Sequence, residues 1–354
     1  MKTKLVLTVI LTSFIFLTGC SNDSMEEPVA LSKNSVIDQT YPGVQKQVLK
    51  TFGAIGASIV NGAGQGYDGP YMNELISYHT YGPKFIEFNN GQSFDSAGNE
   101  DNERQFGVVL KKGGVKQFAA KPGTLKVAVY YGNVANVTFI SDFIMVFEGQ
   151  KEEITIENLI TLLFVKTKGE WKIVHEHHSP LKIDNPVLKE YITKDFVVDP
   201  IYNKEQKEVM ATFGALGASI ANGAGHGYYE PMDELISYHA YGEKFTEFNY
   251  DSEGNGHFFD GADNEHNERQ LFGVDIEEWD DEVNQLGYID NTFQVAVYNE
   301  KVANVTFISD FKLTFKGDTE VTPVNNLITL LFVKIKGEWK IVHEHHSPLG
   351  LEIQ

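Results

Sequence analysis

Cysteine is nearly absent from this chain, since Cys20 is its only example in 354 residues. A single thiol excludes an intramolecular disulfide and any metal site built from several thiolates. Long apolar runs are also missing after Cys20, where no segment approaches the roughly 20 apolar residues of a transmembrane helix. The chain beyond Cys20 is therefore expected to fold in water.

Positive charge is scarce as well. The sequence holds 29 Lys and Arg against 49 Asp and Glu, for a formal net charge of −20. Contacts to nucleic-acid phosphates require clustered Lys and Arg, so no nucleic-acid partner is expected. The Gly-rich stretches GAGQGY (62–67) and GAGHGY (223–228) lack the Lys-Ser/Thr of a phosphate loop, which favours close backbone packing. No cofactor is predicted.

The N-terminus combines Lys2 and Lys4 with an apolar run over 5–17, which has the length of a signal-peptide core. The run ends in LTGC at 17–20, which resembles the lipobox of bacterial lipoproteins. We predict a signal peptide over 1–19 and a lipidated Cys20 that begins a flexible tether over 20–41. Ser21 stands where an inner-membrane lipoprotein often has Asp, so the outer membrane of the cell envelope is the expected location. A buried thiol and a plain secretory signal remain alternatives.

The mature chain contains an internal repeat. GAIGASIVNGAG at 53–64 recurs as GALGASIANGAG at 214–225, and NERQ at 102–105 recurs at 267–270. From 134 to 181 the second copy follows at a constant offset of 168. Solenoid repeats have periods of about 20–50 residues, so this longer period indicates domain duplication. We predict domains over 42–183 and 205–350, joined by a linker over 184–204.

Each copy begins with helical patterns and continues with strand patterns. Amphipathic helices are predicted over 43–61 and 203–222, and shorter helices over 71–80 and 232–240. Runs such as KFIEF, LKVAVYY, NLITLLFVK and EWKIVHEHHS follow, joined by tight turns. This order predicts an α+β fold with an antiparallel sheet.

The KFTEF-type strand and the ending W-K-I-V-H-x-H-x-S resemble the nuclear transport factor 2-like superfamily. The ending is similar to SnoaL-like domains and closest to the association domain of calcium/calmodulin-dependent protein kinase II. The resemblance implies two tandem cone-shaped domains, each with N-terminal helices packed on a curved antiparallel sheet around a pocket. Family members dimerise through the outer sheet face, so the two copies are expected to form an intramolecular pseudo-dimer. Members include isomerases, cyclases, hydratases and non-enzymatic assembly domains, so fold alone does not fix function.

The same resemblance selects one face of the sheet as the wall of the pocket. The arginines of the association-domain pocket are replaced here, which argues against a strongly cationic site. The residues expected in the pocket are Thr138, Asp142, Leu162, Val174, Glu176 and His178, with counterparts Thr306, Asp310, Leu330, Val342, Glu344 and His346.

The polar members of this set suggest an acid–base site. A carboxylate and an imidazole on neighbouring strands, Asp142 with His178 and Asp310 with His346, can exchange protons with a ligand. Ligand binding without catalysis and a purely structural role remain open. The alternating histidines of the last strand also share a face, but no third ligand stands at a fixed spacing, so no metal site is predicted at His175, His177, His343 and His345.

These observations predict a lipid-anchored protein whose pockets bind a small organic ligand or a partner. The alternatives are a cofactor-independent lyase, isomerase or cyclase that uses the Asp/His pairs, and a structural module of the envelope.

Overall fold

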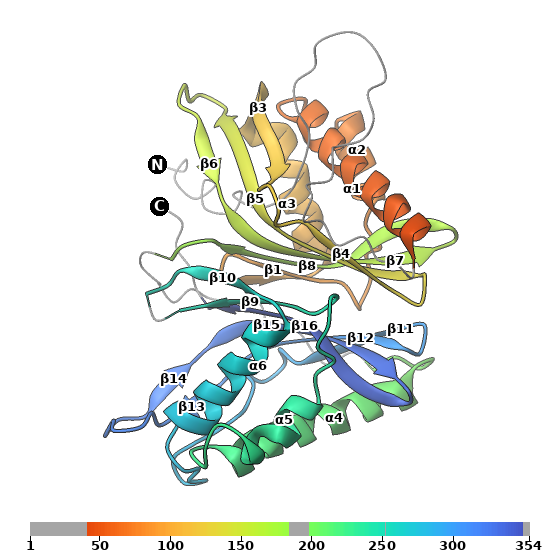
Figure 1. Cartoon of the computed structure of the whole chain (residues 1–354). Helices are drawn as coiled ribbons and strands as arrows, with labels where there is room; N and C mark the ends of the chain where they lie inside the picture. Colours follow the sequence, from red (N-terminus) through yellow and green to blue (C-terminus); the bar gives the residue numbers. More distant parts are fainter. Residues whose placement is uncertain (1–40, 184–197, 252, 350–354) are drawn as a thin grey trace. The chain divides into compact units, whose positions relative to one another are not determined.

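The structure is a computed structural model that describes residues 41–183, 198–251 and 253–349. The chain divides into two compact units (Figure 1). Cys20 and most of the predicted linker lie outside the described residues. No helix of the described part is long and apolar enough to cross a bilayer.

The first domain packs three helices against the concave side of a curved sheet (Figure 1). Its strand order is β2-β1-β8-β7-β5-β3, and β4 and β6 also pair with β5. The elements are α1 (Pro42–Gly62), α2 (Pro70–Ser77), β1 (Ile86–Asn89), β2 (Gln92–Phe94), α3 (Ser96–Val109), β3 (Leu110–Ala120), β4 (Lys126–Tyr130), β5 (Val134–Phe147), β6 (Ile154–Ile156), β7 (Asn158–Thr167) and β8 (Glu170–Pro180).

The second domain repeats this plan with a shorter sheet, in the order β10-β9-β16-β15-β12-β11 and with β13-β14 as a separate hairpin. Its elements are α4 (Asn203–Gly223), the 3₁₀ turn η1 (Glu230–Met232), α5 (Asp233–Ser237), β9 (Thr246–Tyr250), β10 (Gly256–Phe259), α6 (Gly261–Gln270), the π-helical turn η2 (Leu271–Asp275), β11 (Gln294–Tyr298), β12 (Val302–Ile308), β13 (Phe311–Leu313), β14 (Thr322–Val324), β15 (Asn326–Ile335) and β16 (Glu338–Pro348).

Apolar periodicity explains how the first helix of each domain packs. In α1, Val48, Phe52, Ile55 and Ile59 recur every three or four residues and are fully buried. They therefore form one stripe, which joins the inward-facing side chains of the sheet in a single core cluster.

The Gly-rich stretches fix the end of this helix to the next layer, as predicted. The backbone N–H of Gly66 donates to the carbonyl of Gly107 at 2.7 Å, and Gly227 donates to Gly273 at 2.8 Å. A side chain on Gly107 would collide with the backbone of Gly66. These glycines serve close backbone packing.

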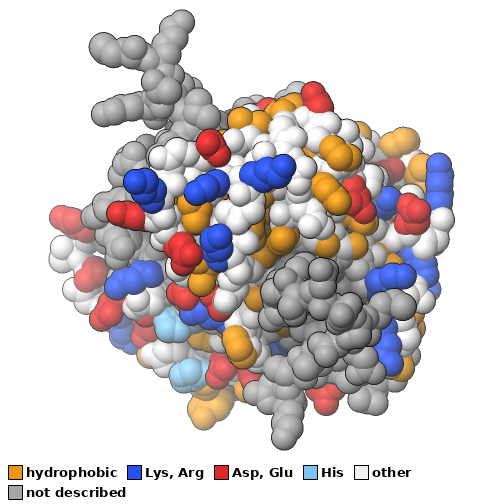
Figure 2. Space-filling model, turned by 90° about the horizontal axis from the view of Figure 1, so that it is seen from above, with side chains coloured by type: hydrophobic (Ala, Val, Ile, Leu, Met, Phe, Trp, Pro, Cys, Tyr) orange, Lys and Arg blue, Asp and Glu red, His pale blue; other side chains and the backbone are white. Residues whose placement is uncertain are grey.

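The sheets are mixed, whereas the sequence predicted antiparallel ones. Each is antiparallel except for one pair, because β1 runs parallel to β8 and β9 runs parallel to β16. On the face shown in Figure 2, acidic and basic side chains are interspersed.

Candidate functional site

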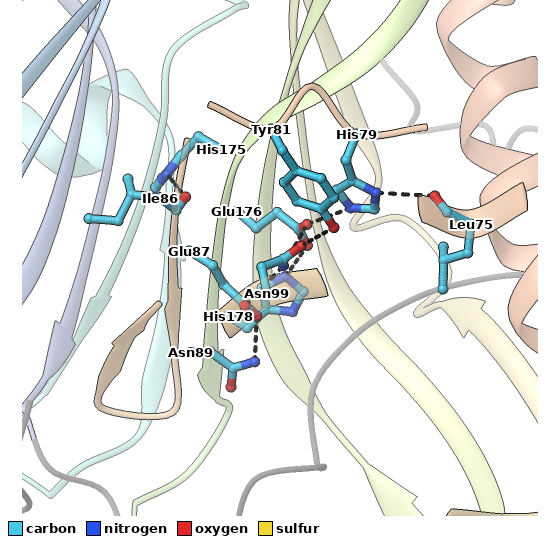
Figure 3. Close-up of polar contacts among 10 residues, drawn as sticks. All are labelled: Leu75, His79, Tyr81, Ile86, Glu87, Asn89, Asn99, His175, Glu176 and His178. Carbon is cyan, nitrogen blue, oxygen red and sulfur yellow. Dashed lines mark hydrogen bonds and ion pairs between the residues drawn. The ribbon is translucent and has the colours of Figure 1, made fainter. Parts of the chain in front are cut away.

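A buried carboxylate joins two histidines at the centre of the first domain (Figure 3). One oxygen of Glu176, on β8, lies 2.9 Å from Nε2 of His79, and the other lies 3.0 Å from Nε2 of His178. All three side chains are fully buried. Glu176 and His178 share a face because side chains two apart on a strand point the same way. His79 follows α2 and reaches the same point from the helical layer.

A second carboxylate, Glu87 on β1, lies beside the first (Figure 3). Its oxygens accept hydrogen bonds from Asn89 at 2.6 Å and from Asn99 at 3.0 Å. Asn99, on α3, also donates to Glu176 at 3.2 Å and accepts from the Tyr81 hydroxyl at 2.7 Å. We call the polar cluster of the first domain the set His79, Tyr81, Glu87, Asn99, Glu176 and His178.

The hydrogen bonds determine the charges in this cluster. Burial alone would raise the pKa of Glu176, but hydrogen bonds from His178 and His79 hold that pKa at about 2, so the group is ionised. Nδ1 of His79 lies 3.1 Å from the Leu75 carbonyl, which only accepts. Both ring nitrogens of His79 therefore face hydrogen-bond acceptors. Burial and the charge of Glu176 raise the pKa of Glu87, which favours its neutral form.

Three of these groups also have the spacing of metal ligands. Ligand atoms of Glu87, Glu176 and His178 lie within 4.8 Å of one another. Hydrogen bonds within the cluster and to Asn89 and Asn99 engage both oxygens of Glu87, both oxygens of Glu176 and Nε2 of His178. The three groups therefore take part in a buried hydrogen-bonded network.

The second domain repeats the cluster almost atom for atom. Glu344 lies 2.9 Å from Nε2 of His239 and 3.0 Å from Nε2 of His346. Burial alone would lower the pKa of His239 and of His346, but the hydrogen bonds and charge of Glu344 raise both above the ordinary value. The polar cluster of the second domain is His239, Tyr241, Glu247, Asn264, Glu344 and His346.

In the second domain the cluster faces a cavity of about 430 Å³. This volume lies within the range of small-molecule sites. His239, Glu344 and His346 form part of its lining, and Asn284 and Gln285 add polar groups from a loop. The apolar lining includes Phe213, Leu216, Phe272, Leu286, Phe307, Phe311, Ile328 and Leu330.

One further carboxyl group lines this cavity. Glu268, on α6, is buried, and both its burial and the charge of Glu344 raise its pKa well above the ordinary value. No hydrogen bond joins the Glu268 carboxyl to another described residue. A neutral carboxyl facing a cavity is able to donate a proton to a bound molecule.

The structure places Glu176 with His178, and Glu344 with His346, in the two polar clusters. The predicted pairing of Asp142 with His178 is not formed. Asp142 accepts a hydrogen bond from Gln117, and Asp310 accepts one from Gln285 at 3.4 Å.

Strand register explains this correction. On β5, Val137 lies opposite the inward-facing Leu162, so the next residue, Thr138, faces the other side and lies opposite Thr161. Thr306 likewise lies opposite Thr329. The predicted pocket face of β5 is therefore wrong by one residue. Thr138 and Asp142 lie outside the site, as do their counterparts Thr306 and Asp310.

A β-bulge corrects the last strand as well. Leu163 pairs with His175 but Phe164 pairs with Ile173, which leaves Val174 as the extra residue. The side-chain alternation is reversed beyond it, so Ile173 and Trp171 join the inner core, although unbroken alternation from Glu176 and His178 would place both on the outer face. Val342 is the corresponding extra residue of β16.

The remaining histidines of the last strand lie on the opposite face from Glu176. Nδ1 of His175 lies 2.8 Å from the carbonyl of Ile86, and His177 packs edge-on against Phe88. Nδ1 of His343 lies 2.7 Å from the Thr246 hydroxyl, and His345 packs against Phe248. Within the described residues, none of the four belongs to a group of three potential metal ligands.

Sequence reasoning missed the carboxyl and amide partners of the site. Glu87, Asn99 and Glu268 lie in segments repeated in both copies, but α3 and α6 are so polar that no apolar period marks them as helices. Two signals pointed to them: Asp95 as a helix N-cap, and a glutamate between the apolar Ile86 and Phe88.

The SnoaL-like domain family matches residues 71–183 and 240–350, more than half of the chain. The chain therefore belongs to this family and carries its domain in two tandem copies, each with the nuclear transport factor 2-like fold. No curated protein matches the chain significantly.

Among solved structures, the association domain of C. elegans calcium/calmodulin-dependent protein kinase II is similar at 13% identity, covering 42% of this chain and 99% of that one (TM-score 0.32). A nuclear transport factor 2-like protein from Salmonella enterica shows 15% identity over 42% of this chain and 92% of its own (TM-score 0.32). A dehydratase-like member from Streptomyces avermitilis shows 13% identity over 42% and 97% (TM-score 0.33).

Proposed function

We propose that the second domain binds a small, mainly apolar organic molecule that carries a hydrogen-bond acceptor at one end. The observation that supports this most directly is the cavity of about 430 Å³ whose mainly apolar lining includes the polar groups of Glu268, Glu344 and His346. An apolar wall with a few convergent polar groups is typical of small-molecule sites.

The proton donors in the cavity indicate which polar group the ligand carries. Nε2 of His346 is engaged by Glu344, and Nδ1 has no hydrogen-bond partner among the described residues. The hydrogen bond and charge of Glu344 raise the pKa of His346, which favours the form that has a proton on Nδ1 to offer to an acceptor. The carboxyl group of Glu268 offers a second proton. A carbonyl, carboxylate or sulfonate oxygen suits these two donors better than a cation does.

The fluorescent probe 8-anilinonaphthalene-1-sulfonate tests this site, because it joins an apolar body to an acceptor group. The full chain is expected to bind it, and His346→Gln to weaken binding by about 10-fold or more, as expected for a lost hydrogen bond to a charged donor. His178→Gln in the first domain is the matched control and should leave the affinity unchanged. Equal affinities for wild type and His346→Gln would refute the proposed site.

The second candidate is a proton-transfer enzyme, a lyase, isomerase or cyclase without a cofactor. It is favoured by one observation: Glu268 has a strongly raised pKa and lies in the cavity with His346, which is typical of acid–base sites. In this reaction Glu268, in place of the predicted Asp310, forms the acid–base pair with His346.

Turnover of carbonyl compounds distinguishes catalysis from binding. Exchange of deuterium into the carbon next to a carbonyl group, followed by NMR over a panel of ketones, reports proton transfer directly. For an enzyme, Glu268→Gln should abolish exchange while the fluorescent probe still binds. The matched variant Glu103→Gln should retain exchange. Absence of exchange across the panel favours a binding protein.

We also propose that the chain is a lipoprotein of the cell envelope, anchored through Cys20 and facing away from the cytoplasm. The lipobox-like LTGC sequence at 17–20 and the polar segment that follows it support this proposal. A structural role in the envelope is the remaining alternative.

A further inference from the structure

The two polar clusters are nearly identical in geometry but differ in exposure. The distances from the central glutamate to its two histidines are 2.9 and 3.0 Å in both domains. In the first domain the side chain of His178 is 0% exposed, whereas in the second the side chain of His346 is 18% exposed. This difference indicates that a side chain next to the cluster differs between the two copies.

Strand register shows which residue next to the cluster differs between the two domains. In the first domain Gln117 pairs with Ile144 and bonds Asp142, and in the second Gln285 pairs with Lys312 and bonds Asp310. These matched contacts align the two segments. The next residue is Phe118 in the first domain and Leu286 in the second.

Phe118 fills space that Leu286 leaves open. The ring of Phe118 is buried and stacks on Phe143, with the ring centroids 4.2 Å apart. In the second domain Phe311 occupies the position of Phe143, and both Phe311 and Leu286 line the cavity. The smaller side chain of Leu286 therefore stands where the first domain has a stacked aromatic pair.

A one-residue insertion accompanies this change. The first domain reads NERQFGV and the second reads NERQLFGV, with Leu271 as the additional residue. The extra residue is taken up in the π-helical turn η2, and Phe272, which follows it, lines the cavity. π-helical insertions of this kind are frequent at functional sites.

We propose that the duplicated domains have divided their roles: the second copy alone carries a site that a ligand can enter, and Phe118 closes the first. This inference deepens the proposed function and rests on it only for the ligand itself. One bound molecule per chain is expected. The first domain keeps the polar cluster as part of its core.

Thiol labelling measures access without any ligand. Leu162 and Leu330 are matched positions that lie opposite the central glutamate on the neighbouring strand. In a Cys20→Ala background, each is changed to Cys in the full chain and treated with methyl methanethiosulfonate. Mass spectrometry should show labelling at 330 at least 10-fold faster than at 162. Equal rates would overturn the proposal.

The filling residues are then exchanged between the copies. Leu286→Phe should slow labelling at 330 about 10-fold, and Phe118→Leu should accelerate labelling at 162, whereas Leu286→Ile, which preserves volume, should change neither rate. Circular dichroism confirms that each variant is folded. If Leu286→Phe folds and leaves the rate at 330 unchanged, Leu286 does not determine access.

The stoichiometry of the fluorescent probe gives a second measurement. One probe molecule per wild-type chain is expected, and two would contradict the division of roles. Unequal labelling combined with no binding of the probe or of any co-purified compound would count against the proposed function while leaving the closure of the first domain intact.

Discussion

At the scale of single residues, the central glutamate of each cluster determines the state of its neighbours. Glu344 accepts from two imidazoles, and its hydrogen bonds and charge raise the pKa of both. Glu344→Gln should therefore lower the pKa of His346, because burial then acts without the compensating charge. Histidine NMR titration of the full chain measures this shift, with Glu176→Gln as a control that leaves His346 unchanged. An unaltered titration would show that Glu344 does not govern His346.

The same pair makes stability depend on pH. A histidine with a raised folded-state pKa stabilises the fold below its unfolded value of about 6.5, and this stabilisation is lost as pH rises through the folded value. Glu344 has a lowered pKa, so its contribution is present above about 4.5 and is lost as pH falls through the folded value. The pair therefore contributes most between about pH 4.5 and 6.5, and Glu344→Gln should flatten the dependence of melting temperature on pH.

In contrast, ionisation of Glu268 is expected to destabilise the folded state. Its raised pKa means that the folded state keeps a proton which the unfolded state releases above about pH 4.5, so ionisation favours unfolding. Glu268→Gln, neutral and similar in shape, should raise the melting temperature at pH 7.5 and change it little at pH 4. The exposed Glu243→Gln is the control. A variant less stable than wild type at pH 7.5 would show that Glu268 is ionised and paired in the native state.

At the scale of elements, close backbone contact joins the loop that follows α1 to α3. A Cβ on Gly107 would lie against the backbone of Gly66 and 3.0 Å from Met72. Gly107→Ala should therefore reduce the free energy of unfolding by about 1–3 kcal/mol, as overpacking does. In contrast, Gly53 within α1 has no neighbour within 4 Å, so Gly53→Ala should stabilise the helix by up to about 1 kcal/mol. Urea unfolding of both variants measures the difference.

The elements also show what the sequence could predict. The helix predicted over 43–61 matches α1, because its apolar stripe has a clear period, and Glu176 and His178 share a face as their spacing requires. The β-bulge at Val174 has no sequence signal, since it depends on pairing with Leu163 and Phe164. The sequence also did not show which face of β5 points inward, because Val137 and Thr138 are both fully paired within the sheet. In both strands the register depends on pairing with a neighbouring strand.

At the scale of the whole molecule, the N-terminal prediction is independent of the fold. If Cys20 carries the lipid, Cys20→Ala should yield a precursor that lacks the diacylglyceryl mass and no longer partitions into the detergent phase. Intact-mass spectrometry and palmitate labelling in a bacterial host test this. Normal labelling of the variant would refute the anchor.

The pairing of the two domains through their sheets is the remaining proposal. By alternation along β7, Leu159, Leu163 and Val165 point away from the inner core, whereas the bulge removes Trp171 and Ile173 from that outer face. Burying each of the three remaining side chains is worth about 1.5–3 kcal/mol as an upper estimate.

A fragment of residues 42–183 should therefore dimerise or aggregate, because it lacks the second copy that would cover this face. Sedimentation velocity at high micromolar concentration measures its size. Leu159→Lys combined with Leu163→Lys is expected to make the fragment monomeric, since a charged face no longer gains from burial. The wild-type fragment sedimenting as a stable monomer would contradict the pseudo-dimer, because the outer face would then need no partner.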